Sequence, residues 1–273
     1  HPFQAFQFGQ KYLAPRIAMQ HGVELIFYGE HMAEYGNSLE EVKTPIMNES
    51  YFIEDNIKDF YAGGVLHSDL MKNYGLTSAD LKHYKPLTSN EIGSSKIEVH
   101  YFGYYEPWHP QGNYYYAVEH GGFVTAPERL SGTYTKYASI DDKMEEFNYY
   151  TLGIKYGLGW TSNVAAFECR SGDLTREEAV SLTKKYDIEF PETWLKDFLD
   201  YVSLPSKEFP EASKHFEQPI MDRNYFDNLV DQFRSPHLWQ LKNHEWSLRK
   251  NCWDEVANGG DEIDSASNWT GNK

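Results

Sequence analysis

Two acidic side chains that follow a short apolar run are the residues best suited to chemistry. Glu30 and Glu34 come after Gly29, which ends the β-branched and aromatic run Val23–Tyr28. Carboxylate oxygens are ligands that Mg²⁺ takes, often while the metal bridges to nucleotide phosphates. The pattern is compatible with a Mg-nucleotide site and equally with an acidic loop that only keeps the surface solvated. A transition-metal site with His31 fits less well, because zinc sites draw on more histidine or cysteine.

The segments around this loop predict its place in a fold. The residues before it have apolar side chains at helical spacing up to Ala18, and Gly22 stands where glycine commonly ends a helix. Helix, glycine, buried strand and polar loop make half of a βαβ unit, and ligands bind at the carboxyl ends of such strands. Ile97–Gly103 predicts a second strand, and Gln111–His120 predicts a helix that Gly121-Gly122 stops.

Aromatic residues gather in the loop after the second predicted strand. Tyr104, Tyr105 and Trp108 lie in this loop, which contains prolines, and their rings could stack on a sugar or a nucleobase. The Tyr114–Tyr116 run falls within the predicted helix, where we interpret the tyrosines as core or interface residues. The loop residues are therefore the stronger candidates for a binding role.

A hydroxyl-rich loop further along carries two cations. Arg129 and Lys136 flank a Ser/Gly/Thr segment, and together they could hold a phosphate, arginine bidentately and lysine as a point charge. The alternative is that they only aid solubility, as charged pairs in exposed loops often do. Motifs for a serine nucleophile, a phosphate-cradling Walker loop or a dinucleotide-binding turn do not occur in the sequence.

The second half of the sequence predicts mainly helices. We expect one from Asp141 onward, one behind the Thr175–Glu178 capping box, one with Pro191 in its first turn and one capped by Asp222. The mixed segment near 44–95 is interpreted as an insertion, with a short helix over 51–61 and a helix start at Thr77 or Ser78. The predicted domains are residues 1–127 for the α/β part, 128–253 for the helical part and 254–273 for a disordered tail.

Composition limits the partners. A net charge of −16 argues against binding nucleic acid or an anionic membrane surface, and the sequence contains no apolar run long enough to span a bilayer. Cys169 and Cys252 are typical of reduced thiols in a cytosolic protein, and a single disulfide between them is the alternative. The chain begins with His1 and not with methionine, so we expect the carboxyl-terminal portion of a longer protein; a processed start is the alternative.

An ordered set of short motifs spans residues 2–253. Together the set resembles the N-acetyl sugar amidotransferases of bacterial lipopolysaccharide, O-antigen and surface-glycan biosynthesis. Its members here are Gly9-Gln10 to Ala14-Pro15, Phe27-Tyr28-Gly29-Glu30, Ala33-Glu34-Tyr35-Gly36-Asn37, Gly103-Tyr104-Tyr105, Gly132-Thr133-Tyr134-Thr135, Ser139-Ile140-Asp141-Asp142-Lys143, Ile154-Lys155-Tyr156-Gly157, Thr175-Arg176-Glu177-Glu178-Ala179 and Ser235-Pro236-His237-Leu238-Trp239.

The resemblance implies a fold and a reaction. The family belongs to the PP-loop ATP pyrophosphatases, so it implies a partial Rossmann-like α/β core followed by a mainly helical carboxyl-terminal region. ATP would activate the amide oxygen of a nucleotide-linked N-acetyl sugar, and ammonia from a separate glutaminase subunit would replace that oxygen to give an acetamidino group. The family's S-G-G-x-D-S phosphate loop does not occur in this sequence. We therefore expect this chain alone to be inactive.

The resulting assignment gives each candidate residue a role. Gly29, Glu30 and Glu34 would bind Mg-ATP, with Mg²⁺ on the two glutamates, in a cytoplasmic enzyme. The sugar nucleotide would be bound by Tyr104, Tyr105, Trp108, Arg129, Thr133 and Lys136. The rival interpretation is a non-catalytic module of the same descent that binds a sugar or docks a partner.

Overall fold

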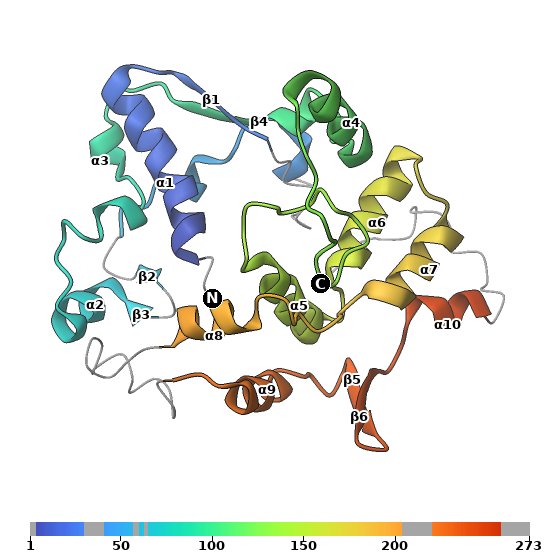
Figure 1. The fold of residues 1–273 in the computed structure, drawn as a ribbon. Helices are drawn as coiled ribbons and strands as arrows, with labels where there is room; N and C mark the ends of the chain where they lie inside the picture. The colour runs from blue at the N-terminus through green and yellow to red at the C-terminus, as the bar shows by residue number, and fades with distance from the viewer. Residues whose placement is uncertain (1–3, 30–40, 57–59, 63–64, 204–219, 258–273) are drawn as a thin grey trace, which may run out of the picture. The chain divides into compact units, whose positions relative to one another are not determined.

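The structure is a computed structural model, and it describes residues 4–29, 41–56, 60–62, 65–203 and 220–257. The chain divides into two compact units, and the division falls after Trp108, whereas the sequence predicted a boundary after residue 127. Unit 1 comprises the described residues up to Trp108, and unit 2 comprises the described residues from His109 onward (Figure 1). The fold is mixed α/β and mostly helical, with few short strands.

Unit 1 is built on a parallel strand pair next to a long helix. Helix α1 spans Gln4–His21, and Gly22 follows it at a φ of 66°, a left-handed conformation that suits glycine. Strand β1 (Leu25–Tyr28) pairs in parallel with β4 (Glu98–Tyr101), in a register that sets Phe27 opposite His100. Both predicted strands are confirmed. The Rossmann-like core stays a prediction, because two parallel strands are common to many α/β folds.

The core of unit 1 lies between α1 and one face of this pair. It contains Tyr12 and Ala18 from α1 and Val99 and Tyr101 from β4, all of them buried. Because side chains alternate across a strand, the other face carries Leu25 and Phe27, which are about half exposed.

The segment between the two strands contains short elements. In chain order they are η2 (Glu41–Lys43), η3 (Glu49–Tyr51), β2 (Tyr61–Ala62), β3 (Val65–Leu66), α2 (His67–Tyr74), η5 (Lys82–Tyr84) and α3 (Ser89–Ile92), and η6 (Phe102–Tyr104) follows β4. Strands β2 and β3 form an antiparallel pair.

Two helix predictions for this segment are wrong. The helix expected over 51–61 is reduced to η3, after which Ile53 forms a parallel bridge to Leu87. The helix expected from Thr77 does not form, although Thr77 and Asp80 exchange hydrogen bonds as a helix start would. The chain instead forms turns and the short η5, which ends before Lys85, where the following Pro86 favours extended backbone.

Unit 2 is mainly helical. Its helices are α4 (Pro110–Gly121), α5 (Glu145–Tyr156), α6 (Trp160–Ser171), α7 (Arg176–Tyr186), α8 (Leu195–Val202), α9 (Arg223–Gln232) and α10 (Cys252–Ala257). Helices α6 and α7 pack side by side (Figure 1). Strands β5 (Trp239–Lys242) and β6 (Glu245–Leu248) form a hairpin that the sequence did not predict.

Local signals account for several helix ends in unit 2. Gly122 ends α4, the Thr175 and Glu178 capping box starts α7, and Asp222 caps α9, as predicted. Pro191, predicted in a first helical turn, is instead buried ahead of α8, which begins at Leu195.

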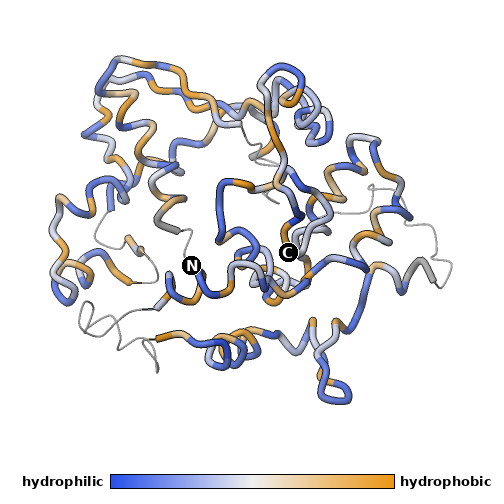
Figure 2. Tube along the Cα trace, in the orientation of Figure 1, coloured by the Kyte–Doolittle hydropathy of each residue, from blue (hydrophilic) through white to orange (hydrophobic). Residues whose placement is uncertain are grey.

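Aromatic rings form the core between α5, α8 and α9. The Phe147 and Phe198 rings stack with centroids 4.0 Å apart, and both meet Phe226 edge-on. Cys169 and Cys252 are both free thiols, as the sequence suggested. Hydrophobic residues occur in short stretches along the trace (Figure 2), and no helix in the described ranges is long and apolar enough to cross a membrane.

Candidate functional site

The carboxyl ends of β1 and β4 lie side by side in unit 1, as the parallel pairing requires. Gly29 follows β1 at this edge, and a Cβ added there would meet no atom within 4 Å. Glu30 and Glu34 lie outside the described residues, so the magnesium assignment stays a prediction. Within the described residues, no group of three or more His, Cys, Asp or Glu side chains could hold a metal ion.

An aromatic cluster occupies this edge and includes one predicted residue. The Phe27 ring meets His100, Phe102 and Tyr105 edge-on, with centroids 5.8–5.9 Å apart. The Tyr105 hydroxyl lies 2.6 Å from His100 Nδ1, and the two rings are stacked. Phe27, His100 and Phe102 were not predicted as site residues, although the period-2 alternation of the two strands could have placed Phe27 and His100 on one face.

The other two residues predicted in this loop are exposed. The Tyr104 hydroxyl donates to the Lys43 carbonyl oxygen at 3.4 Å, and 46% of the residue is exposed. Trp108 is 47% exposed. The rings of this loop are accessible to a ligand, and their role in binding stays a prediction.

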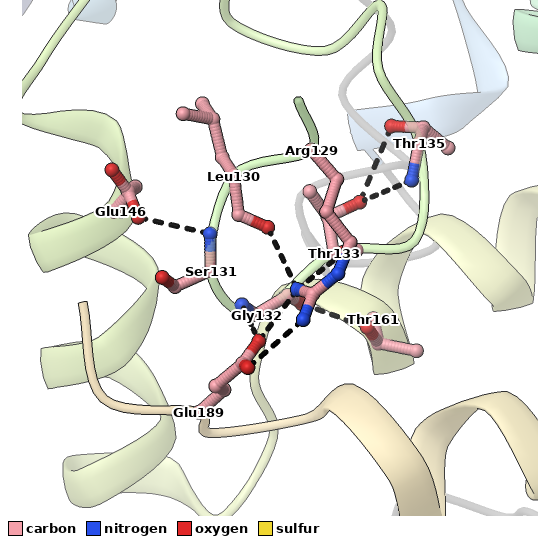
Figure 3. Close-up of polar contacts among 9 residues, drawn as sticks. All are labelled: Arg129, Leu130, Ser131, Gly132, Thr133, Thr135, Glu146, Thr161 and Glu189. Carbon is pink, nitrogen blue, oxygen red and sulfur yellow. Dashed lines mark hydrogen bonds and ion pairs between the residues drawn. The ribbon is translucent and has the colours of Figure 1, made fainter. Parts of the chain in front are cut away.

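In unit 2, Arg129 is held by internal contacts (Figure 3). Its two terminal nitrogens donate to the two oxygens of Glu189 at 2.6 and 3.0 Å, a bidentate pair. Nη1 also donates to the carbonyl oxygens of Leu130 and Thr133, and the guanidinium lies over the Tyr186 ring. The hydrogen bond from Arg129 holds the pKa of Glu189 below its ordinary value. A phosphate bound by Arg129 would have to displace a carboxylate.

The loop around Thr133 is fixed from several helices. Gly132, at a φ of 82°, donates its amide to Glu189, and its carbonyl oxygen accepts from the Thr161 hydroxyl of α6 at 2.7 Å (Figure 3). Ser131 donates its amide to Glu146 of α5 at 2.9 Å. Thr133 is fully buried, and its hydroxyl bonds within the loop to Thr135. In this conformation the Thr133 side chain therefore makes contacts within the loop and is not accessible to a ligand.

Beside this loop lies a cavity of about 690 Å³. This volume falls in the range of ligand pockets, roughly 300–1,000 Å³. The lining includes Gln111, Tyr114 and Tyr115 from α4, Tyr137 from the loop, Glu168 from α6 and Asp173 from the α6–α7 turn. Lys136 also lines the cavity and donates to the Pro127 carbonyl oxygen at 2.7 Å. Of the three unit 2 residues predicted to bind substrate, Lys136 is the one on the cavity wall.

A buried carboxylate anchors the wall of the cavity. Glu168 is 3% exposed and accepts hydrogen bonds from the Tyr134 hydroxyl at 2.5 Å and the Tyr137 hydroxyl at 3.1 Å. Burial, together with the charge of Glu168, raises the pKa of both tyrosines, so their hydroxyls stay protonated and act as donors. The Tyr137 ring stacks on Tyr114, with centroids 4.6 Å apart. The sequence reasoning did not propose Glu168, although an acid on the inward face of α6 with Thr161 and Ala165 is a signal of a buried polar role.

The geometry defines unit 2 as a mainly helical unit with a cavity lined by polar and aromatic side chains and of the size of ligand pockets. Residues 131–252 match the model of a family described as LPS biosynthesis protein WbpG-like, C-terminal domain. This region is thus similar to a domain of lipopolysaccharide biosynthesis proteins, the process that the motifs had indicated. The matched range includes Tyr134, Tyr137 and Glu168 and begins after α4. No curated protein was found to match the chain.

Proposed function

We propose that this chain is part of an ATP-dependent amidotransferase of lipopolysaccharide and O-antigen biosynthesis. The substrate is a nucleotide-linked N-acetyl sugar, and the product carries an acetamidino group in place of the acetamido group. The observation that carries the proposal is the family match over residues 131–252, to which the motifs between Gly9 and Tyr105 add. The parallel pairing of β1 and β4 supports a nucleotide site in unit 1, because ligands bind at the carboxyl ends of such strands.

The reaction balances without a redox step. The amide oxygen attacks the α-phosphorus of ATP, and pyrophosphate leaves. Ammonia from a glutaminase subunit then adds to the amide carbon, and AMP departs with the former amide oxygen. Adenylation is needed because an amide carbonyl is a poor electrophile and its oxygen a poor leaving group. In this proposal Gly29, Glu30 and Glu34 serve Mg-ATP, and Tyr104, Tyr105 and Trp108 face the sugar nucleotide.

The test is exchange of labelled pyrophosphate into ATP, measured with the natural protein that contains this chain. We expect exchange that depends on a nucleotide-linked N-acetyl sugar and is lost in Glu30→Ala and Glu34→Ala. The matched control is Glu24→Ala, an exposed glutamate just before β1, which should retain exchange. Exchange that survives both variants would refute the metal assignment, and no sugar-dependent exchange at all would refute the amidotransferase.

The second candidate is a non-catalytic module that binds the sugar. One observation favours it: the cavity of unit 2 is lined by side chains fixed by hydrogen bonds, among them Glu168 and Gln111. Such fixed walls suit binding. A module of this kind would bind the sugar nucleotide, but adding the sugar nucleotide would not increase ATP–pyrophosphate exchange. The same assay therefore separates the two candidates.

A further inference from the structure

We propose that the cavity of unit 2 binds the sugar ring of the substrate, stacked against its tyrosines, and excludes the diphosphate. That the sugar is N-acetylated rests on the proposed function. That the cavity suits a sugar ring rests on three features of its lining: charge, hydrogen-bonding capacity and aromatic surface.

The charge of the lining argues against a phosphate. Its charged side chains are two carboxylates, Glu168 and Asp173, and one ammonium, Lys136. Lys136 already donates to the Pro127 carbonyl oxygen, and the other nearby cation, Arg129, is paired with Glu189. A diphosphate would therefore meet carboxylates with few cations to offset its charge, which is unfavourable in a partly enclosed site.

The same carboxylates are not arranged for a cationic ligand. Both oxygens of Glu168 accept from tyrosine hydroxyls, and Asp173 lies 2.7 Å from His109 Nε2. Each group already has a partner, so neither is an isolated negative charge that needs a cation. A neutral ligand that both donates and accepts hydrogen bonds fits this lining best.

Hydrogen-bonding capacity remains for sugar hydroxyls. A carboxylate offers about four lone-pair sites, of which Glu168 uses two. The single proton of the Tyr137 hydroxyl is shared between Glu168 and Gln111, 3.2 Å away, and the charged carboxylate is the stronger acceptor. The Gln111 oxygen thus keeps capacity to accept from a ligand.

The aromatic surface supplies the apolar contact that a sugar ring needs. Tyr114 stacks on Tyr137 and packs against Tyr115, with ring centroids 5.3 Å apart in the second pair. The Tyr115 hydroxyl is held by the Gln111 amide at 2.6 Å, which fixes the ring at the cavity wall while 58% of the residue is exposed. A ring that is held in place loses little freedom when a ligand binds.

The test compares two neighbouring tyrosines of α4 in the full chain. Tyr115 lines the cavity, whereas Tyr116, 67% exposed, packs on His120 and is not among the cavity residues. Binding of free N-acetylglucosamine, UDP-N-acetylglucosamine and UDP would be measured by saturation-transfer NMR and calorimetry. We expect Tyr115→Ala to weaken binding of both sugar ligands roughly tenfold, and Tyr116→Ala to leave it unchanged. Binding of UDP should be the same in both variants.

Each result bears on one claim. Sugar binding that survives Tyr115→Ala, or a chain that binds UDP but no sugar, would overturn the cavity assignment. The amidotransferase proposal would stand in either case if sugar-dependent exchange of pyrophosphate is observed. Conversely, Tyr115-dependent sugar binding without exchange would retain the cavity assignment and refute the reaction. Melting temperatures of the two variants, which we expect to be similar, check that the comparison is between folded proteins.

Discussion

The two loops that the sequence nominated for substrate binding differ in what their side chains do. In unit 1, the aromatic residues after β4 are about half exposed, with Trp108 at 47%. In unit 2, Arg129 and Thr133 are bound into the structure, by a bidentate carboxylate pair and by complete burial. Side chains whose types suit ligand binding can thus be engaged in contacts within the protein instead. In unit 2 the cavity beside the loop, whose lining includes Lys136 and Glu168, is therefore a better candidate for ligand binding than the loop itself.

Removing the anchor of that cavity should have the largest effect. Glu168→Ala removes the carboxylate that accepts from the partly buried hydroxyls of Tyr134 and Tyr137, leaves Tyr137 with the weaker acceptor Gln111, and opens space between α6 and the loop. We expect a loss of about 2–4 kcal/mol in the free energy of unfolding, measured by urea titration with circular dichroism. The control is Glu177→Ala, at an exposed position of α7, with a change below about 0.5 kcal/mol. Equal effects of the two variants would show that Glu168 does not hold the wall.

The Arg129–Glu189 ion pair should make the free energy of unfolding depend on pH in the acidic range. The hydrogen bond from Arg129 lowers the pKa of Glu189 in the folded protein. Its stabilising contribution is therefore present above the ordinary glutamate pKa, roughly 4.3, and is lost as pH falls through the lowered folded value. Arg129→Ala should cost about 1–2 kcal/mol at pH 7, an amount that allows for partial solvent exposure of the pair.

The shape of the pH curve is the sharper measurement. Unfolding free energies of the original protein and of Arg129→Ala should differ most at neutral pH and differ less in strong acid, where Glu189 is protonated and only the contacts of Arg129 to Leu130, Thr133 and Tyr186 remain. Lys184→Ala, which removes an exposed cation of α7, should give a curve parallel to the original. A constant gap between the original protein and Arg129→Ala down to pH 2 would mean that the pair does not titrate as the structure indicates.

The sequence could predict what its local patterns encode. The capping box of Thr175 and Glu178 lies within four residues and starts α7 where predicted. The strands β1 and β4 were recognised from apolar runs that end in glycine. Lipopolysaccharide biosynthesis was also predicted, through motifs, and the family match agrees with it.

The parts that sequence reasoning missed depend on distant partners. Helix α6 has Gly159 at its start and no local side-chain cap. Its first amides are capped from 28 residues away by Asp187, which accepts from Gly159 N at 2.9 Å and from Ser162 N at 3.0 Å. Such a cap leaves no trace in the helix's own sequence. The hairpin was hidden for a local reason, because its two turn residues, Asn243 and His244, both have positive φ without the glycine that usually signals such a turn.

The same physics explains the misjudged site in unit 2. Arg129 and Glu189 are 60 residues apart, and Glu168 lies more than 30 residues from each of its tyrosines. A sequence shows the types of these side chains but not which of them pair. A cation in a hydroxyl-rich loop therefore suggests a phosphate site until its partner is seen. Exposed residues such as Trp108 are less subject to this error, because their side chains are not used by the core.

The smallest expected change in stability tests the loop of unit 1. Trp108→Ala should alter the free energy of unfolding by less than about 0.5 kcal/mol, because the residue is half exposed. If its ring stacks on the nucleobase, binding of UDP-N-acetylglucosamine and of UDP should weaken roughly tenfold, while binding of free N-acetylglucosamine should not change. For UDP alone the expected response is opposite to that of Tyr115→Ala, which leaves UDP binding unchanged, so calorimetry with UDP and with free N-acetylglucosamine tests the two residues separately. Unchanged nucleotide binding in Trp108→Ala would show that this exposed residue does not contact the nucleotide.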